Sequence, residues 1–221
     1  LLENRGALNT MSVSIVEVEN QILMVVLVKD SPSRSRLECF ELAAPTFDEP
    51  RYIGAFAPNT YMGFHNDRLR VLQDQRLVIP VSFCENNGVR TRGRSKSLDF
   101  SSPRTSALLF SSDFGRSWEL DEHRIKLPKR GAMEPCITEY GNGNLLVTLR
   151  TQLGSIYQTR YSGNRWTEPS TLGIESPEAP HTLVMDPYSG IMYLVHCPNF
   201  VDNVHHFGPR YPLVIRSSSD S

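Results

Sequence analysis

The sequence predicts an all-β fold assembled from repeated hairpins. Strand-like stretches dominate the 221 residues, and no long stretch has the 3.6-residue period of an amphipathic helix. A sequence pattern of two apolar runs around a short turn occurs four times. Its second run begins at Ile22, Leu77, Leu145 and Ile191. These positions are 55, 68 and 46 residues apart, and a hairpin of that size cannot bury its own faces. The units must therefore stack on one another.

The four hairpins follow in chain order. The first joins the alternating residues 13–19 to 22–28, and the second joins 69–72 to 77–79. The third joins 136–140 to 145–147, and the fourth joins 182–185 to 191–194. The last two turns, 141–144 and 186–190, are rich in Gly, Asn, Asp, Pro and Ser, which favour tight turns.

The octet Ser111–Trp118 has the form S-x-D-x-G-x-x-W and follows the strand-like run 107–110. The carboxylate of Asp113 can accept hydrogen bonds from backbone N–H groups further along and so close a turn. Gly115 supplies a left-handed backbone position that other residues reach only with strain. Trp118 is a large apolar anchor with one N–H donor. The octet therefore predicts the tip of a β-hairpin.

This octet resembles the Asp box, the repeat of the sialidase (neuraminidase) superfamily of β-propellers, also called the BNR repeat. A weaker copy without the Asp spans Thr159–Trp166, Phe47 marks an earlier one, and a further box begins at Ser218. The resemblance implies a six-bladed propeller, of which residues 1–221 form a single domain of about four blades. Because the last box is cut off before its Gly and Trp, we expect this chain to be a fragment. In the family the box is structural and lies away from substrate.

Composition argues against several kinds of partner. The 23 basic and 24 acidic residues leave a net charge of −1, so no long-range field attracts nucleic acid or an anionic membrane. One basic segment, 90–96, has no interleaved aromatic residues, and a solvated loop is a simpler account of it than an RNA site. We expect a glycan or a small acidic sugar as ligand, with no nucleic acid and no membrane span. The oligomeric state is open.

The cysteine and histidine pattern predicts no cofactor and no metal. The four cysteines lie far apart without a C-x-x-C pair, which argues against zinc and leaves disulfides open. Exposed loop positions account better for His205 and His206 than a metal site does, since a third ligand at suitable spacing is missing. No apolar run reaches the ~18–20 residues of a membrane helix. The chain starts without Met or a signal-like stretch, so its compartment is not readable.

Polar residues precede three of the four second runs. Stepping back eleven residues from Leu77, Leu145 and Ile191 leads to the polar or proline-marked segments 65–68, 133–135 and 178–181. Charged side chains directly before an apolar inner strand are unusual for a purely structural position. These segments are therefore the candidates for chemistry.

The segments 133–136 and 149–151 resemble a part of sialidases in which a Glu precedes one inner strand and an Arg ends the next. The resemblance implies that Glu134 is the general base that polarises a tyrosine nucleophile. It implies that Arg150 belongs to a triad that clamps the carboxylate of the sugar. The segment 210–217 is similar to the one that holds another triad arginine, which would be Arg210, with Arg216 as its close competitor.

The residue types fit that chemistry. A planar guanidinium presents paired donors that match a carboxylate, so several arginines can hold an acidic sugar in one orientation. A carboxylate nucleophile would be repelled by such a sugar, and sialidases use a neutral Tyr activated by a Glu instead. The structural alternatives are that Glu134 caps a turn or pairs with an Arg, and that Arg150 forms a surface ion pair.

The sequence also departs from the family. No F/Y-R-x-P segment supplies the first triad arginine, and Asn4-Arg5-Gly6 is a poor match. The catalytic acid should be an Asp after the second strand of the first unit, where Asp30 is the only acid, displaced by a few residues. The nucleophilic Tyr should follow Asp220. Asn66 and Arg68 are candidate substrate contacts, with a structural turn as the alternative.

Three functions follow from this reading. The first is a sialidase-like exo-glycosidase that hydrolyses terminal acidic sugars. The second is a non-catalytic carbohydrate-binding propeller that keeps Glu134 and Arg150 for recognition. The third is another glycan-active hydrolase or a lyase on the same scaffold, because a fold does not determine a function.

Overall fold

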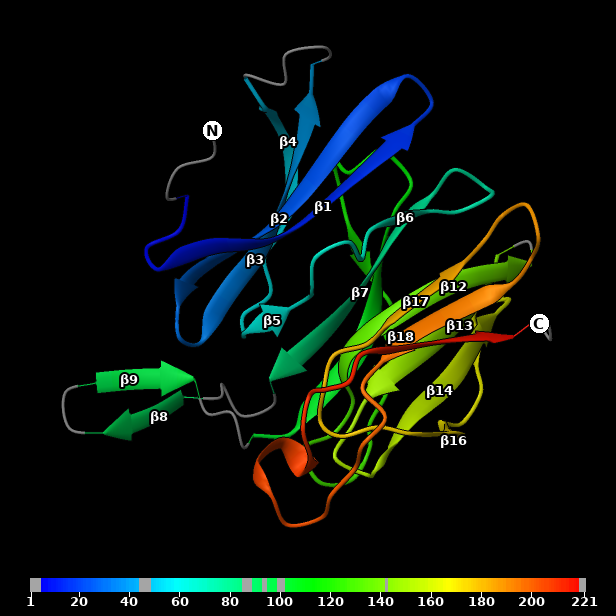
Figure 1. The fold of residues 1–221 in the computed structure, drawn as a ribbon. Helices are drawn as coiled ribbons and strands as arrows, with labels where there is room; N and C mark the ends of the chain where they lie inside the picture. The colour runs from blue at the N-terminus through cyan, green and yellow to red at the C-terminus, as the bar shows by residue number, and fades with distance from the viewer. Residues whose placement is uncertain are drawn as a thin grey trace. The chain divides into compact units, whose positions relative to one another are not determined.

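The computed structural model is built from β-strands and describes residues 5–43, 49–84, 89–92, 95–98, 102–141 and 143–218 (Figure 1). For 89–92 and 95–98 it describes the backbone alone. The copy expected at Phe47, the basic segment 90–96 and the box that begins at Ser218 therefore lie wholly or partly outside the described residues. The chain forms two compact units, Leu1–Arg124 and Ile125–Ser221. Within the described ranges, no helix is long and apolar enough to cross a membrane.

The first sheet of the first unit has four antiparallel strands in chain order (Figure 1). They are β1 (Asn9–Val18), β2 (Gln21–Ser31), β3 (Arg34–Leu42) and β4 (Arg51–Phe56). The first hairpin is confirmed, because Val18 pairs with Gln21 and Val16 with Leu23. The pairing shifts between Met11 and Ser14, which marks a bulge in β1.

The second sheet of this unit is centred on two fully buried strands, β7 (Leu77–Cys84) and β10 (Arg104–Ser111). The short strands β5 (Met62–Gly63) and β6 (Arg70–Val71) pair with β7, and β11 (Glu119–Leu120) pairs with β10. The second hairpin is confirmed by the pairs of β6 with β7. A separate hairpin of β8 (Val89–Arg92) and β9 (Ser95–Leu98) lies between β7 and β10 in the chain.

The octet forms the turn between β10 and β11, as its sequence predicts. The backbone N–H and the hydroxyl of Ser117 donate to the carboxylate of Asp113 at 2.8 and 2.6 Å. The N–H of Gly115 donates to the Ser111 hydroxyl at 2.8 Å, and Gly115 has a φ of +84°. Trp118 donates from its indole N–H to the Gly115 carbonyl at 3.1 Å and is 8% exposed. The tryptophan is thus an anchor in the core, at the outermost strand of its sheet.

One apolar core joins the two sheets of the first unit. It contains Val25 and Cys39 from the first sheet and Ile79 and Leu109 from the second, together with Trp118. The contact is close enough that Gly54 in β4 lies against the backbone of residues 115–116, where a side chain would not fit.

The first sheet of the second unit contains β12 (Met133–Gly141), β13 (Asn144–Arg150) and β14 (Ser155–Ser162). β14 also pairs with β15 (Arg165–Trp166) and β16 (Ser170–Glu175). The third hairpin is confirmed by pairs such as Thr138 with Leu146. The weaker copy of the octet forms the β14–β15 hairpin, in which Tyr161 packs edge to face against Trp166 with ring centroids 5.1 Å apart.

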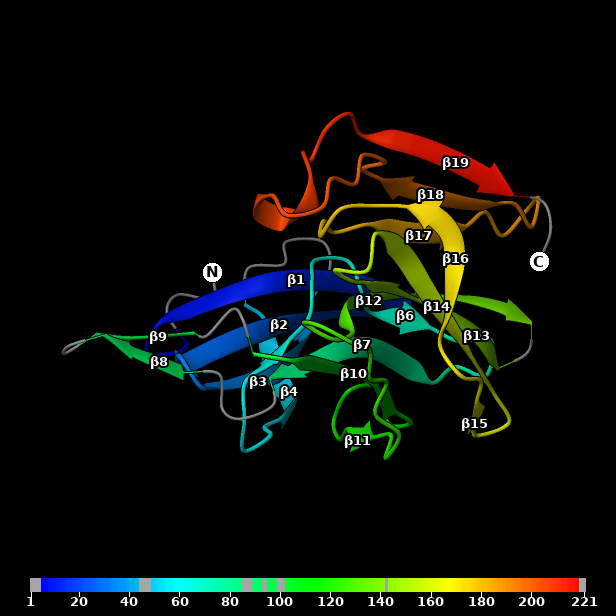
Figure 2. The ribbon, with the colours of Figure 1, turned by 90° about the horizontal axis from the view of Figure 1, so that it is seen from below.

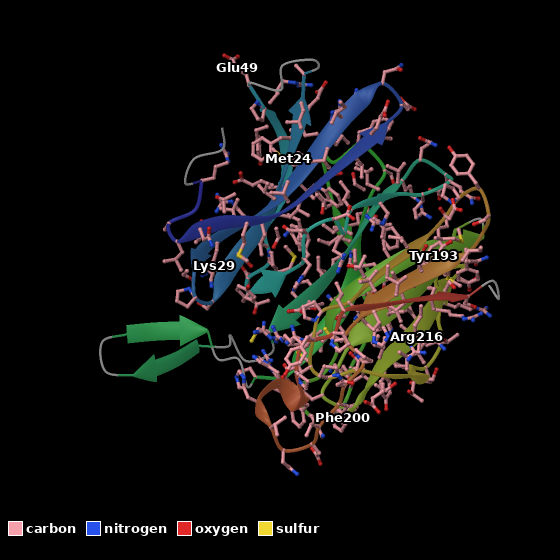
Figure 3. The ribbon with its side chains drawn as sticks, in the orientation of Figure 1. Met24, Lys29, Glu49, Tyr193, Phe200 and Arg216 are labelled. Carbon is pink, nitrogen blue, oxygen red and sulfur yellow. The ribbon has the colours of Figure 1, made fainter. Side chains whose placement is uncertain are left out.

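The second sheet of this unit has three strands, β17 (Thr182–Met185), β18 (Met192–His196) and β19 (Val214–Ser218), which Figure 2 shows side by side. The pairing of β17 with β18 confirms the fourth hairpin. A long loop between β18 and β19 includes the short 3₁₀ helix η2 (His205–Phe207). Within this loop Phe200, labelled in Figure 3, stacks on Phe207 with centroids 6.0 Å apart.

The two sheets of the second unit share their own core. Cys136 and Leu146 from one sheet pack with Leu183 and Leu194 from the other. His181 adds a polar link, since its Nε2 lies 2.8 Å from the Thr148 hydroxyl. All four cysteines of the chain are buried free thiols, so the structure contains none of the disulfides that the sequence left open.

Candidate functional site

Glu134 lies at a β-bulge in β12. Met133 pairs with Arg150 and Cys136 pairs with Thr148, so the two residues Glu134 and Pro135 face one residue of β13. Pro135 has no N–H to contribute to the ladder, which suits a bulge. Glu134 has a φ of +43°, a strained conformation for a residue with a side chain. Strain of this kind is found at functional sites when the surroundings maintain it.

Arg150 is the last residue of β13, and its side chain is 7% exposed. Its Nη1 donates to the carboxylate of Glu134 at 2.5 Å. Its Nη2 donates to the carbonyl oxygen of Glu178 at 3.1 Å and lies 3.4 Å from the Glu178 carboxylate. Its buried Nε has no hydrogen-bond partner within the part of the chain that the structure describes. The register of the β12–β13 hairpin and the bulge in β12 therefore bring Glu134 and Arg150 into direct contact.

Arg210 approaches the same place from the loop after η2. Its Nη2 donates to the Glu178 carbonyl oxygen at 3.2 Å, the same oxygen that Arg150 contacts. The two guanidinium groups therefore lie side by side. Arg216, by contrast, donates from its Nε to His196 Nε2 at 3.0 Å on β18 (Figure 3).

Glu178 connects these groups. Its side chain is 3% exposed, and its carboxylate forms an ion pair with Arg130 and accepts a hydrogen bond from Gln152 Nε2 at 2.9 Å. Arg130, Arg150 and Arg210, together with Glu134 and Glu178, form what we call the arginine cluster. Three guanidinium groups and two carboxylates leave the cluster with one excess positive charge.

The electrostatics favour an ionised Glu178 and a neutral His206. Burial acts to raise the pKa of Glu178, but the hydrogen bond from Gln152 and the charges of Arg130 and Arg150 outweigh it and lower that pKa below its ordinary value. Burial lowers the pKa of His206, and the positive charge of Arg210 lowers it further, against the opposing effect of Glu178. Counted with an ionised Glu178 and a neutral His206, the cluster carries its one excess positive charge.

Asp30 lies within β2, near its end, and not in a loop. Both of its carboxylate oxygens accept from Arg36 on β3. Arg36 also donates from Nε to the buried Glu38 at 2.8 Å, and Glu38 forms an ion pair with Arg5. This network contains two arginines and two carboxylates, so its net charge is zero. The arginine cluster, by contrast, carries one excess positive charge.

Asn66 and Arg68 lie between β5 and β6. The amide oxygen of Asn66 accepts from the Val13 N–H at 2.9 Å, and the Arg68 N–H donates to the Ser14 hydroxyl at 2.8 Å. Asn66 is exposed, whereas Arg68 is 5% exposed. These contacts fasten the segment before β6 to the bulge of β1. They account for both positions as supports of the fold, and substrate contact by these two residues stays a prediction.

Two residues that contact Glu178, Arg130 and Gln152, were not singled out from the sequence, and His206 was assigned there to an exposed loop. The segment 178–181 had been noted as polar before an inner strand, which was a usable signal for Glu178. His206 is only half-buried, but its Nδ1 lies 3.7 Å from the Glu178 carboxylate, so a solvated loop position does not describe it fully. Within the described residues, no group of three or more His, Cys, Asp or Glu side chains could hold a metal ion.

No protein-family model and no curated protein matches the sequence. Solved structures do match. A Hadza microbial sialidase aligns with a TM-score of 0.66 at 11% identity, over 96% of this chain and 43% of the other. The Trypanosoma rangeli sialidase bound to 2,3-difluorosialic acid aligns with a TM-score of 0.65 at 14% identity, over 96% of this chain and 37% of the other. This chain therefore spans about two fifths of the length of these sialidases.

An enzyme with a different name has a similar structure. An endo-arabinase from Bacteroides thetaiotaomicron aligns with a TM-score of 0.54 at 12% identity, over 97% of this chain and 77% of the other. At such identities the similarity concerns the backbone fold. With the four larger sheets, the two-stranded β8–β9 sheet apart, and their confirmed hairpins, this similarity shows that the chain has an all-β fold of four blades, of the sialidase β-propeller type.

Proposed function

We propose that this chain belongs to a sialidase-like exo-glycosidase that hydrolyses terminal acidic sugars of the sialic acid class. The observation that carries the proposal is that Arg150 and Arg210 donate to one carbonyl oxygen while Arg150 also holds Glu134. Two adjacent guanidinium groups and a carboxylate are the groups that an Arg-clamped sugar acid and a Glu-activated nucleophile require.

The charge of the arginine cluster supports an anionic ligand. Its excess positive charge attracts a carboxylate, and paired guanidinium donors match the two oxygens of that group. A sugar held by its carboxylate is fixed in orientation, so its anomeric carbon meets the catalytic groups in a defined geometry.

Glu134 would act as the base. In the sialidase scheme it accepts the proton of a tyrosine hydroxyl, and the oxygen attacks the anomeric carbon to form a covalent glycosyl intermediate. The bulge and the strained backbone aim the Glu134 carboxylate toward Arg150 instead of into the regular pleat. Asp30 is proposed as the catalytic acid, and to donate a proton it would have to leave its contact with Arg36.

A second candidate is glycan recognition or hydrolysis without the sialidase mechanism. The Arg36 contact of Asp30 favours it, because a binding propeller needs no acid at that position. The fold similarity to an endo-arabinase is compatible with a different glycan hydrolase.

The test is release of a reporter phenol from an aryl sialoside by the protein that contains this chain. We expect Glu134→Gln to slow release by about 100-fold or more, since general acid–base groups contribute ~10²–10⁴-fold. The matched control is Glu139→Gln in the same strand, where the carboxylate accepts from the Gly143 N–H at 2.8 Å. Equal rates for wild type and Glu134→Gln would remove Glu134 from the mechanism. Sugar binding without any phenol release would favour the second candidate.

A further inference from the structure

Glu178 lies in the connection between β16 and β17, at a position where the chain turns tightly. The N–H of Ala179 donates to the Pro177 carbonyl at 2.7 Å, and the N–H of Glu178 donates to the His206 carbonyl at 2.8 Å. The second bond ties the connection to the η2 loop that also carries Arg210. Residues 176–179 are all buried, so the backbone of this turn is held by its surroundings.

The side-chain carboxylate and the main-chain carbonyl of Glu178 both contact arginine side chains. The carboxylate contacts Arg130 and lies 3.4 Å from Arg150 Nη2, while the carbonyl accepts from Arg150 and Arg210. The three arginines come from different parts of the second unit: Arg130 precedes β12, Arg150 ends β13, and Arg210 follows η2. Through these contacts Glu178 joins all three arginines.

We propose that Glu178 is the positioning residue of the carboxylate clamp, holding Arg150 and Arg210 beside each other for an acidic sugar. This inference rests on the proposed function. Its physical basis is that like charges repel, so guanidinium groups in a partly buried place need an internal anion to stay together. At 3% exposure the carboxylate is covered by the groups it holds, and it therefore acts through the arginines instead of touching the sugar.

The charge of Glu178 allows an opposite interpretation, in which it competes with the ligand for the arginines. A competing carboxylate would have to be displaced before the sugar binds, and its removal would tighten binding. The contacts favour positioning, because Gln152 and Arg130 hold the carboxylate while the main-chain carbonyl of Glu178 contacts Arg150 and Arg210. The two interpretations predict opposite signs for one substitution.

The test is calorimetric titration of the protein that contains this chain with N-acetylneuraminic acid and with its uncharged methyl ester. The variant is Glu178→Gln, which keeps the shape of the side chain and removes its charge. We expect the affinity for the acid to fall on the order of tenfold, which is less than the loss when a buried charge that contacts its partner directly is removed, because Glu178 acts through the arginines. The affinity for the ester should change less than about twofold. A residue needed only for folding would instead weaken both ligands alike.

The matched control is Glu175→Gln. Glu175 is an exposed carboxylate of β16 that accepts from the Phe200 N–H at 2.9 Å, and we expect this variant to bind like wild type. If wild type prefers the acid and Glu178→Gln binds it equally or more tightly, positioning is wrong and the proposed function stands. If wild type does not distinguish the acid from the ester, the proposed function fails and this inference fails with it.

Discussion

Replacing Gly115 by alanine tests whether the octet is a close-packed turn or only a local hairpin. Gly115 has a φ of +84°, and a Cβ built there would lie 2.5 Å from the Sγ of Cys39. Cys39 is fully buried in β3, in the sheet opposite the octet. The substitution therefore combines backbone strain with overpacking between two sheets of the first unit.

The two costs can be estimated separately. A residue with a side chain in the left-handed region costs about 1 kcal/mol relative to glycine. Overpacking of a closely packed core costs about 1–3 kcal/mol. We expect Gly115→Ala to lower the free energy of unfolding by about 3 kcal/mol, which for a chain of this size is roughly 6–12 °C in Tm.

Three control variants separate the cost of backbone strain from the cost of overpacking. Gly54→Ala introduces a clash with the backbone of residues 115–116 without a positive φ, and should cost about 2 kcal/mol. Gly190→Ala, with a φ of +71° and no atom within 4 Å, should show the strain alone, about 1 kcal/mol. Gly63→Ala, whose nearest atom would be a Tyr61 ring carbon at 3.4 Å, should cost less than about 1 kcal/mol.

The assay for the first unit is urea denaturation followed by Trp118 fluorescence. The chain has two tryptophans, so a Trp166→Phe background leaves Trp118 as the only reporter. Gly190→Ala lies in the second unit and is measured by thermal unfolding followed by circular dichroism. If Gly115→Ala were as stable as Gly63→Ala, the close contact between the octet and β3 would be refuted.

Two further predictions concern pH and thiol chemistry. The folded-state pKa of Glu178 is lowered, so its stabilisation is complete above the ordinary value of about 4.5 and is lost as pH falls through the lower folded value. The difference in Tm between wild type and Glu178→Gln should accordingly shrink between pH 7 and pH 3, and a constant difference would contradict the ion pairs. Burial raises the pKa of the Cys39 thiol to about 12, and all four thiols are buried. The native protein should react with Ellman's reagent at pH 8 on the order of 100-fold more slowly than in denaturant, and a fast native thiol would refute the burial.

The sequence predicted the local features well. The four hairpins follow from apolar alternation around short turns, and each pairs in the expected place. The octet was recognisable because its hydrogen bonds join residues at most four apart, such as Asp113 and Ser117. The spacing of Glu134 and Arg150 on one hairpin was also visible, although the bulge that brings them together was not.

The positions of side chains between elements were harder to predict. Asp30 stood out as the only acid in its segment, but its partner Arg36 comes from the next strand, and both oxygens are held there. His206 resembled an exposed loop residue in the sequence, because nothing local indicates that its loop folds back onto Glu178.

The four hairpins and the octet turn could be predicted from the sequence, because they depend on neighbours a few residues away. The meeting of Arg130, Arg150 and Arg210 around Glu178 could be seen only in the folded chain. The hydrogen bonds that Arg150 and Arg210 donate to the Glu178 carbonyl oxygen span 28 and 32 residues of chain. They form because the two sheets of the second unit share a core and the η2 loop returns to it. Such convergence depends on packing between sheets, which periodicity along the chain does not encode.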